Sequence, residues 1–104
     1  MKLITKELEK RFARIGDQSE VADPIVVARF FNPCGAGTWL ATEYNPETRI
    51  FFGFVSIFGD HNDEWGSFSL AELESLKVGP GGLLGIERDR YFTERRFSEV
   101  RNGQ

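Results

Sequence analysis

The sequence predicts an α+β domain in which an antiparallel sheet of four to five strands carries two or three short helices. Three observations predict it: an apolar stripe at helical spacing near the N-terminus, four later β-branched or aromatic runs bounded by turn residues, and a capped helical segment after the last of these runs. Helices packed on one antiparallel sheet are the simplest architecture for this order. The chain has 104 residues, of which 40% are hydrophobic, so we expect one domain over residues 1–104.

The first predicted helix covers residues 6–15. Its apolar residues recur three or four positions apart and share one face: Ile4, Leu8, Phe12 and Ile15. Thr5 can cap the start of this helix, because its hydroxyl can accept a hydrogen bond from a free backbone N–H of the first turn. Gly16 can end the helix, since glycine adopts a positive φ without strain.

Four runs rich in β-branched and aromatic residues follow, and each predicts a strand. They cover residues 25–31, 38–44, 49–58 and 65–68. The third run places large apolar side chains on both of its faces, with Phe52 on one and Phe51 on the other. A strand that is buried on both faces belongs in the middle of a sheet covered by helices. We therefore expect residues 49–58 to form the central strand.

A second helix is predicted over residues 70–77. Ser69 is followed three residues later by Glu72, which is the pattern of a capping box. Leu70, Leu73 and Leu76 keep helical spacing within it. The rest of the chain predicts irregular backbone at residues 79–82, a last strand at residues 86–92 and a short helix or tail at residues 93–100.

The composition argues against several classes of protein. No run approaches the roughly 20 apolar residues that span a bilayer, and the charged N-terminal residues do not resemble a signal peptide. Cys34 is the only cysteine, so no intrachain disulfide forms and we expect a cytoplasmic protein. One cysteine and one histidine are too few for a transition-metal site, and we expect no metal and no cofactor.

Motifs that suggest catalysis fail on detail. The glycine-rich residues 79–85 lack the Gly-Lys-Ser/Thr ending of a phosphate loop, and they follow a predicted helix instead of a strand. Residues 60–64 resemble the start of a calcium loop, but Trp65 stands where that loop requires glycine. Cys34 and His61 could form a dyad only if the fold brought them together. A small enzyme of unknown class is therefore kept only as an alternative.

The net charge of −3 is unevenly distributed. Residues 1–14 carry five basic side chains, whereas residues 59–75 carry five acidic side chains and no Lys or Arg. The acidic run is either solvated surface or a surface that meets a basic partner. We predict a partner-binding patch that combines an aromatic anchor with charges that steer approach, made of Asp60, Asp63, Glu64 and Trp65. Trp65 has a second interpretation, as a core residue at the start of a strand.

A second candidate contact surface lies in the last predicted strand. In an extended segment, Glu87 and Asp89 share one face and Arg88 points to the other. Carboxylates opposite guanidinium groups indicate a recognition strand that includes these three residues. A charged edge strand that resists aggregation gives the same pattern.

Short segments along nearly the whole chain carry a resemblance to a known family. In order, they are MKLITKEL (1–8), DPIV (23–26), FF (30–31), TW (38–39), TEY (42–44), FFG (51–53), FSL with EL (68–73) and IERD with YF (86–92). Together they resemble a domain-of-unknown-function family of short proteins carried on bacterial plasmids, integrative elements and phages. The resemblance implies an association with mobile DNA and supplies no catalytic residues to transfer.

Three functions stay open. The favoured hypothesis is a non-enzymatic, protein-binding accessory protein of a mobile genetic element, which could inhibit a host defence complex by offering carboxylates where nucleic-acid phosphates bind. The alternatives are a nucleic-acid accessory protein, which would use the basic first helix and exposed aromatics such as Trp39 and Tyr44 for stacking, and a small enzyme. We expect a protein partner, no membrane and no tight binding to duplex DNA, and the oligomeric state is left open.

Overall fold

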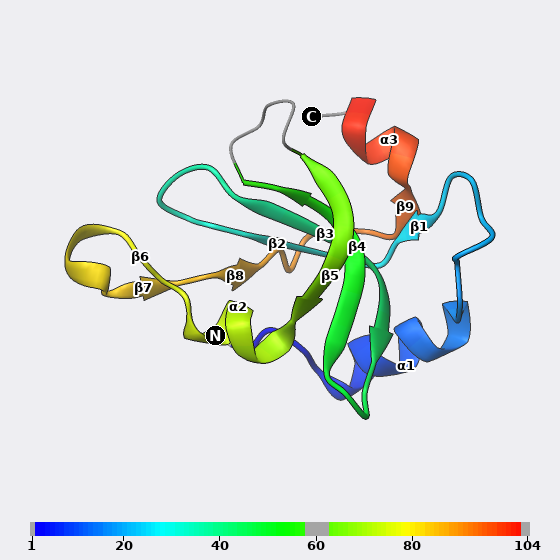
Figure 1. The fold of residues 1–104 in the computed structure, drawn as a ribbon, viewed down its shortest axis with the longest axis horizontal. Helices are drawn as coiled ribbons and strands as arrows, with labels where there is room; N and C mark the ends of the chain where they lie inside the picture. The colour runs from blue at the N-terminus through cyan, green and yellow to red at the C-terminus, as the bar shows by residue number, and fades with distance from the viewer. Residues whose placement is uncertain (1, 58–62, 103–104) are drawn as a thin grey trace.

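The computed structural model describes residues 2–57 and 63–102, which form three α-helices and nine short or medium strands within these ranges (Figure 1). In chain order the elements are α1 (Lys6–Ile15), β1 (Ile25–Val26), β2 (Ala28–Phe31), β3 (Thr38–Asn45), β4 (Ile50–Ser56), β5 (Glu64–Ser69), α2 (Leu70–Ser75), β6 (Lys77–Val78), the 3-10 turn η1 (Pro80–Gly82), β7 (Leu84–Gly85), β8 (Glu87–Arg88), β9 (Arg95–Arg96) and α3 (Phe97–Asn102). The predicted α+β class is confirmed.

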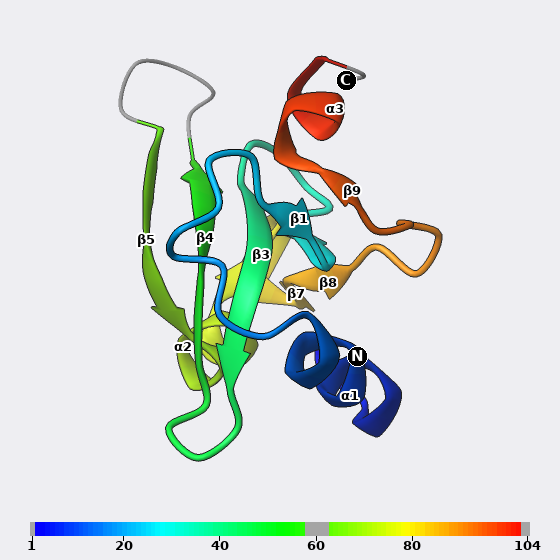
Figure 2. The ribbon, with the colours of Figure 1, turned by 90° about the vertical axis from the view of Figure 1, so that its right-hand side faces the viewer.

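The main sheet has five antiparallel strands in the order β5-β4-β3-β2-β8. Two further pairs, β1 with β9 and β6 with β7, form two-stranded sheets. The prediction that residues 49–58 form the central strand is wrong, because β3 occupies the centre and β4 lies between β3 and β5. In Figure 2, β5 and β8 lie on opposite sides of β3 and β4.

One face of the sheet carries the larger core, and α1 packs on it. The Thr5 Oγ1 accepts a hydrogen bond from the Leu8 N–H at 3.1 Å, and Gly16 ends the helix at φ 73°, so both predicted caps are confirmed. Leu8 and Phe12 of α1 are buried against the sheet. The Phe51 ring, which is fully buried, lies at the middle of this core.

The helix α2 begins as predicted and ends two residues early. The Ser69 Oγ accepts a hydrogen bond from the Glu72 N–H at 2.9 Å, which is the predicted N-terminal cap. The helix ends at Ser75, and Leu76, which has extended backbone, is 41% exposed. The backbone of the next residues pairs with β7 as strand β6, and this pairing replaces the predicted last helical turn.

The other face of the sheet carries a smaller core under β1, β9 and α3. Its buried members are Val26, Leu40, Phe54 and Val100. The predicted single strand at residues 25–31 is divided at Val27, because β1 pairs with β9 while β2 pairs with β3 and β8. This smaller core covers only part of the face, which leaves the Phe52 side chain 40% exposed. The expectation that residues 49–58 are buried on both faces is therefore wrong at Phe52.

The predicted strand at residues 86–92 is reduced to the two residues of β8. Asp89 ends it, because its carboxylate Oδ1 accepts a hydrogen bond from the Tyr91 N–H at 3.0 Å and turns the chain. Tyr91 is 89% exposed, so the predicted alternation of faces does not extend past Asp89. The hairpin of β6, η1 and β7 projects from one end of the molecule (Figure 1).

Candidate functional site

A β-bulge in β3 decides which side chains reach the open part of the second face. Ala41 pairs with Gly53 and Glu43 pairs with Phe52, so Thr42 is an extra residue with no partner in β4. An extra residue reverses the alternation of side chains that follow it. The bulge consequently directs Glu43 to the open face beside Phe52 and directs Tyr44 to the core face beside Phe51.

Two features hold the bulge in place. The Thr42 hydroxyl donates a hydrogen bond to the Phe52 carbonyl oxygen at 3.2 Å. A Cβ atom on Gly53 would lie 2.0 Å from the Leu40 carbonyl oxygen, so only glycine permits this approach of β3 and β4. A glycine within a strand commonly marks such a close backbone approach.

Phe52 and Trp65 form an exposed aromatic pair on this face. Their rings are stacked at 6.2 Å with an interplanar angle of 17°, and the residues are 40% and 39% exposed. Trp65 also contacts Phe54 at 5.5 Å and Phe97 at 4.7 Å between ring centroids. Trp65 therefore packs on the smaller core with one part of its ring and leaves another part open, which combines the two interpretations offered by the sequence.

The segment between α1 and β1 forms the opposite wall and makes a groove of about 400 Å³. In Figure 2 this segment passes in front of β3 and β4. The Gln18 side chain fixes the segment, because Nε2 donates to the carbonyl oxygens of Ile25 and Thr42 at 2.8 Å each and Oε1 accepts from the Ile25 N–H at 2.7 Å. The residues that line the groove are Gln18, Ser19, Val21, Ala22, Pro24, Thr42, Glu43, Phe52 and Trp65.

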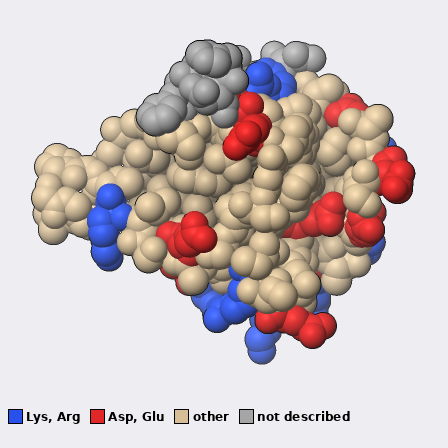
Figure 3. All heavy atoms as spheres, viewed as in Figure 1, with Lys and Arg blue, Asp and Glu red and all other residues tan. Residues whose placement is uncertain are grey.

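The charge of the groove is negative. Among the described residues that line it, Glu43 alone is charged. The Glu43 Oε2 accepts a hydrogen bond from the Gln18 N–H at 3.2 Å, which holds the carboxylate at the groove wall. The neighbouring carboxylates of Asp17 and Glu20 are exposed, and a hydrogen bond from the Ser19 backbone lowers the pKa of Asp17. Figure 3 shows Asp and Glu side chains gathered on the side of the molecule where this segment lies.

Phe52, Trp65, Phe54 and Phe97 form an aromatic cluster, and the end of this cluster next to α3 holds a cation of this chain. The Arg101 guanidinium lies over the Phe54 ring at 4.8 Å and over the Phe97 ring at 6.0 Å. Its Nη1 lies 3.8 Å from the Asp63 Oδ2, and the Asp63 side chain is only 11% accessible. Asp63 therefore anchors α3 to the start of β5.

The structure divides the predicted acidic patch. Asp60 lies outside the described residues. Glu64 pairs with Val55, which packs on the larger core, whereas Trp65 pairs with Phe54 of the smaller core, so Glu64 and Trp65 point to opposite faces. Of the three predicted residues that the structure describes, Trp65 alone lines the groove, while Asp63 lies at the opposite end of the aromatic cluster.

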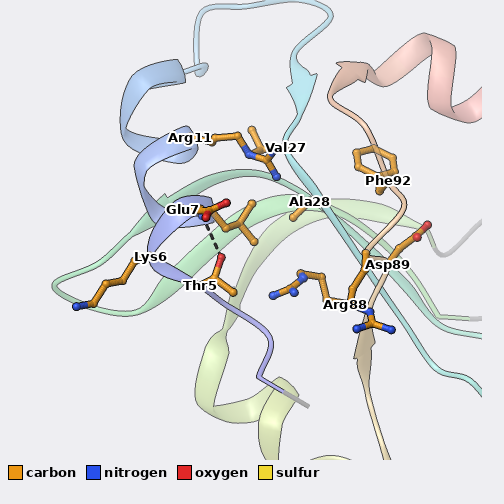
Figure 4. A pocket seen from close by; sticks show the side chains of 11 residues that line it. Thr5, Lys6, Glu7, Arg11, Val27, Ala28, Arg88, Asp89 and Phe92 are labelled. Carbon is orange, nitrogen blue, oxygen red and sulfur yellow. Dashed lines mark hydrogen bonds between the residues drawn. The ribbon is translucent and has the colours of Figure 1, made fainter.

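The second predicted cluster borders another hollow, of about 420 Å³, between the start of α1 and β8 (Figure 4). Arg88 and Asp89 line this hollow, while Glu87, which pairs with Phe31, does not. The Arg88 Nη1 donates to the Lys2 carbonyl oxygen at 3.1 Å, and Asp89 forms an ion pair with Arg29 at 3.3 Å. These contacts attach the N-terminal segment and β8 to the sheet, and a partner-binding role for Glu87, Arg88 and Asp89 stays a prediction.

Comparison with known proteins identifies the family. A family model described as a protein of unknown function (DUF2958) matches residues 3–100. The chain belongs to the DUF2958 family. No curated protein and no solved structure matches it. The match confirms the resemblance as far as a family of unknown function, and it contains nothing on plasmids, phages or other mobile DNA.

For this DUF2958 protein, the nucleic-acid alternative depends on Trp39 and Tyr44 as exposed residues on which bases could stack. Trp39 is only 7% exposed, and Tyr44 packs against Phe51 at 4.6 Å and against Phe12 at 5.8 Å. Trp39 therefore belongs to the larger core, and the expectation that it is exposed is wrong, whereas Tyr44 is half-buried and packs against that core. Within residues 2–57 and 63–102, no three His, Cys, Asp or Glu side chains form a group that could hold a metal ion.

The sequence predicts Trp65 of the DUF2958 groove and misses Phe52 and Glu43. Phe52 is expected in the core, and the bulge that brings Glu43 beside it is not expected. The available signal is Gly53, since glycine inside an apolar strand indicates a bulge or a close backbone approach.

No described helix is both long enough and apolar enough to cross a membrane.

Proposed function

We propose that this DUF2958 protein is a non-enzymatic accessory protein that binds another protein through the groove lined by Phe52 and Trp65. The observation that carries the proposal is the stacked pair of aromatic rings, each about 40% exposed, in a groove with a carboxylate wall. Aromatic side chains in partly enclosed surface pockets supply much of the binding energy of protein interfaces. A solvated strand surface without a partner has no need of two adjacent exposed rings.

The acidic surroundings favour a basic partner surface. Glu43, Asp17 and Glu20 raise the local concentration of cationic groups and speed their association. Surfaces that bind nucleic acid are rich in Lys and Arg. We propose that the basic surface that this protein occupies belongs to a host defence complex. The resemblance to proteins carried on mobile DNA leads us to propose also that it acts in the bacterial cytoplasm as cargo of a mobile genetic element.

The proposal is tested by capture of the partner with matched variants. Tagged wild-type protein and Phe52→Ser are used to capture proteins from a lysate of the bacterial host, and the captured protein is identified, purified and titrated. Because Phe52 is 40% exposed, Phe52→Ser is expected to remain folded and to weaken binding by tenfold or more, about the cost of truncating an interface anchor.

The control changes a large exposed apolar residue elsewhere. Leu83 is 85% exposed at the tip of the β6–β7 hairpin, so Leu83→Ser removes exposed apolar surface without changing the groove. It is expected to bind the purified partner with wild-type affinity. Equal binding by wild type and Phe52→Ser, with both folded, would refute the groove as the binding surface.

A further inference from the structure

The aromatic cluster already binds one arginine of its own chain. At the end next to α3, the Arg101 guanidinium lies 4.8 Å from the centre of the Phe54 ring and 3.8 Å from an Asp63 carboxylate oxygen. The ring faces attract the cation, and the carboxylate forms an ion pair with it. This site consists of the Phe54 and Phe97 ring faces, one carboxylate and one arginine.

The groove presents the same two kinds of group, aromatic ring faces and a carboxylate, at the other end of the cluster. Phe52 and Glu43 are direct cross-strand partners, so their side chains lie next to each other on the open face. Trp65 stacks on Phe52 and extends the aromatic surface. The carboxylate is held by the Gln18 N–H, and within residues 2–57 and 63–102 no Lys or Arg lines the groove. The ring faces and the carboxylate are present here, and the arginine is missing.

We propose that the groove binds an arginine side chain of the partner protein, with the guanidinium on the Phe52 and Trp65 rings and against the Glu43 carboxylate. This inference rests on the proposed function and names the chemistry of its partner. Arginine fits better than lysine, because a planar guanidinium can stack on a ring while it donates in its plane to a carboxylate. An ammonium group is a compact, strongly hydrated charge that gains less from this combination.

The test uses a blocked Gly-Arg-Gly peptide as the probe and two-dimensional NMR of the ¹⁵N-labelled protein as the readout. The chain has two tryptophans, so two indole N–H signals report separately on the half-exposed Trp65 and the buried Trp39. We expect saturable shifts of the Trp65 indole and of backbone signals around Glu43, with little change at Trp39. The same peptide with citrulline in place of arginine keeps the shape and removes the charge, and we expect at least fivefold weaker binding, and weaker binding of Gly-Lys-Gly as well.

Two matched pairs of variants assign the binding to the groove. Glu43→Gln keeps an acceptor for the Gln18 N–H and removes the charge, while Glu74→Gln makes the same change on the exposed side of α2. Phe52→Leu keeps an apolar side chain and removes the ring, while Phe52→Tyr keeps the ring. We expect Glu43→Gln and Phe52→Leu to weaken arginine binding about fivefold or more, and the other two to bind like wild type.

The outcomes separate this inference from the proposed function. Equal shifts with arginine and citrulline peptides, equal binding by Glu43→Gln and wild type, or shifts confined to the hollow beside Arg88 would each overturn the arginine site. If the purified partner still requires Phe52 while the arginine peptide does not bind, the arginine inference fails and the protein-binding function stands. If the arginine peptide binds and the purified partner binds Phe52→Ser with wild-type affinity, the proposed function fails instead.

Discussion

Phe51 and Phe52 are neighbours on β4 whose side chains point to opposite faces, and we predict very different costs of truncating them. Phe51 is fully buried, and its ring contacts those of Tyr44, Phe68 and Phe30 at 4.6–5.3 Å. Phe51→Ala leaves a closed cavity at the middle of the larger core. Such a substitution lowers the free energy of unfolding by about 3–5 kcal/mol.

Phe52→Ala removes a ring that is 40% exposed, so the substitution loses the transfer free energy of only the buried part of the ring. Complete burial of a phenylalanine side chain contributes about 1.5–3 kcal/mol, and the buried part of Phe52 corresponds to about 1–2 kcal/mol. The space left by the ring opens to solvent at the groove, so no closed cavity adds to the cost. The two variants should therefore differ by about 1–4 kcal/mol, with Phe51→Ala the less stable.

Urea denaturation measures this difference, provided that the slope m is the same for wild type and both variants. A domain of this size has a total stability of only about 5–15 kcal/mol, so at the low end of this range Phe51→Ala leaves too little stability to measure in urea. In that case Phe51→Leu, which removes less volume, replaces it and is still expected to cost more than Phe52→Leu. Equal losses at the two positions would show that Phe52 is a core residue and that the groove is closed in solution.

Two further predictions concern the backbone of the bulge and the attachment of α3. Gly53→Ala is expected to lower the free energy of unfolding, measured by urea denaturation, by more than about 3 kcal/mol, because its Cβ would meet the Leu40 carbonyl oxygen. Gly66→Ala is the control, since no atom lies within 4 Å of its Cβ, and its free energy of unfolding should be close to that of wild type. Hydrogen bonds from the Ser98 hydroxyl and N–H lower the pKa of Asp23 below 3.8. The stability that these bonds add is therefore present above that pH and is lost as the pH falls through the lowered pKa. In thermal melts, the difference in Tm between wild type and Asp23→Ala should shrink in that acidic range, and a constant difference would contradict the prediction.

Features that depend on residues close in the sequence were predicted well. The caps made by Thr5 and Ser69 each involve a hydroxyl and an N–H three residues later, so the sequence contains both partners. The apolar stripe of α1 is also a local pattern, and Leu8 and Phe12 are buried as it predicts. Helix starts and the burial of regular helical faces therefore follow from the sequence alone.

Features that depend on contacts between distant segments were missed. The position of β8 beside β2 depends on such contacts, because the Asp89 N–H donates to the Arg29 carbonyl oxygen at 2.9 Å and the Asp89 carboxylate pairs with the Arg29 guanidinium. The segment at residues 25–31 changes partner at Val27 because β9, some 70 residues later in the chain, pairs with β1. Neither partner is visible from the local pattern, which describes propensity and not pairing.

The bulge at Thr42 shows why the composition of the groove could not be predicted even where the strands were. Strict alternation from Leu40, whose side chain lies on the groove face, would return Tyr44 to that face and would turn Glu43 toward the larger core. The extra residue exchanges them, so that Tyr44 packs on Phe51 and the Glu43 carboxylate lies beside Phe52. A carboxylate directed into the larger core would have to be desolvated there without a partner cation, and that cost favours the bulged register. The same backbone irregularity thus completes the core and supplies the charge on which the proposed arginine site depends.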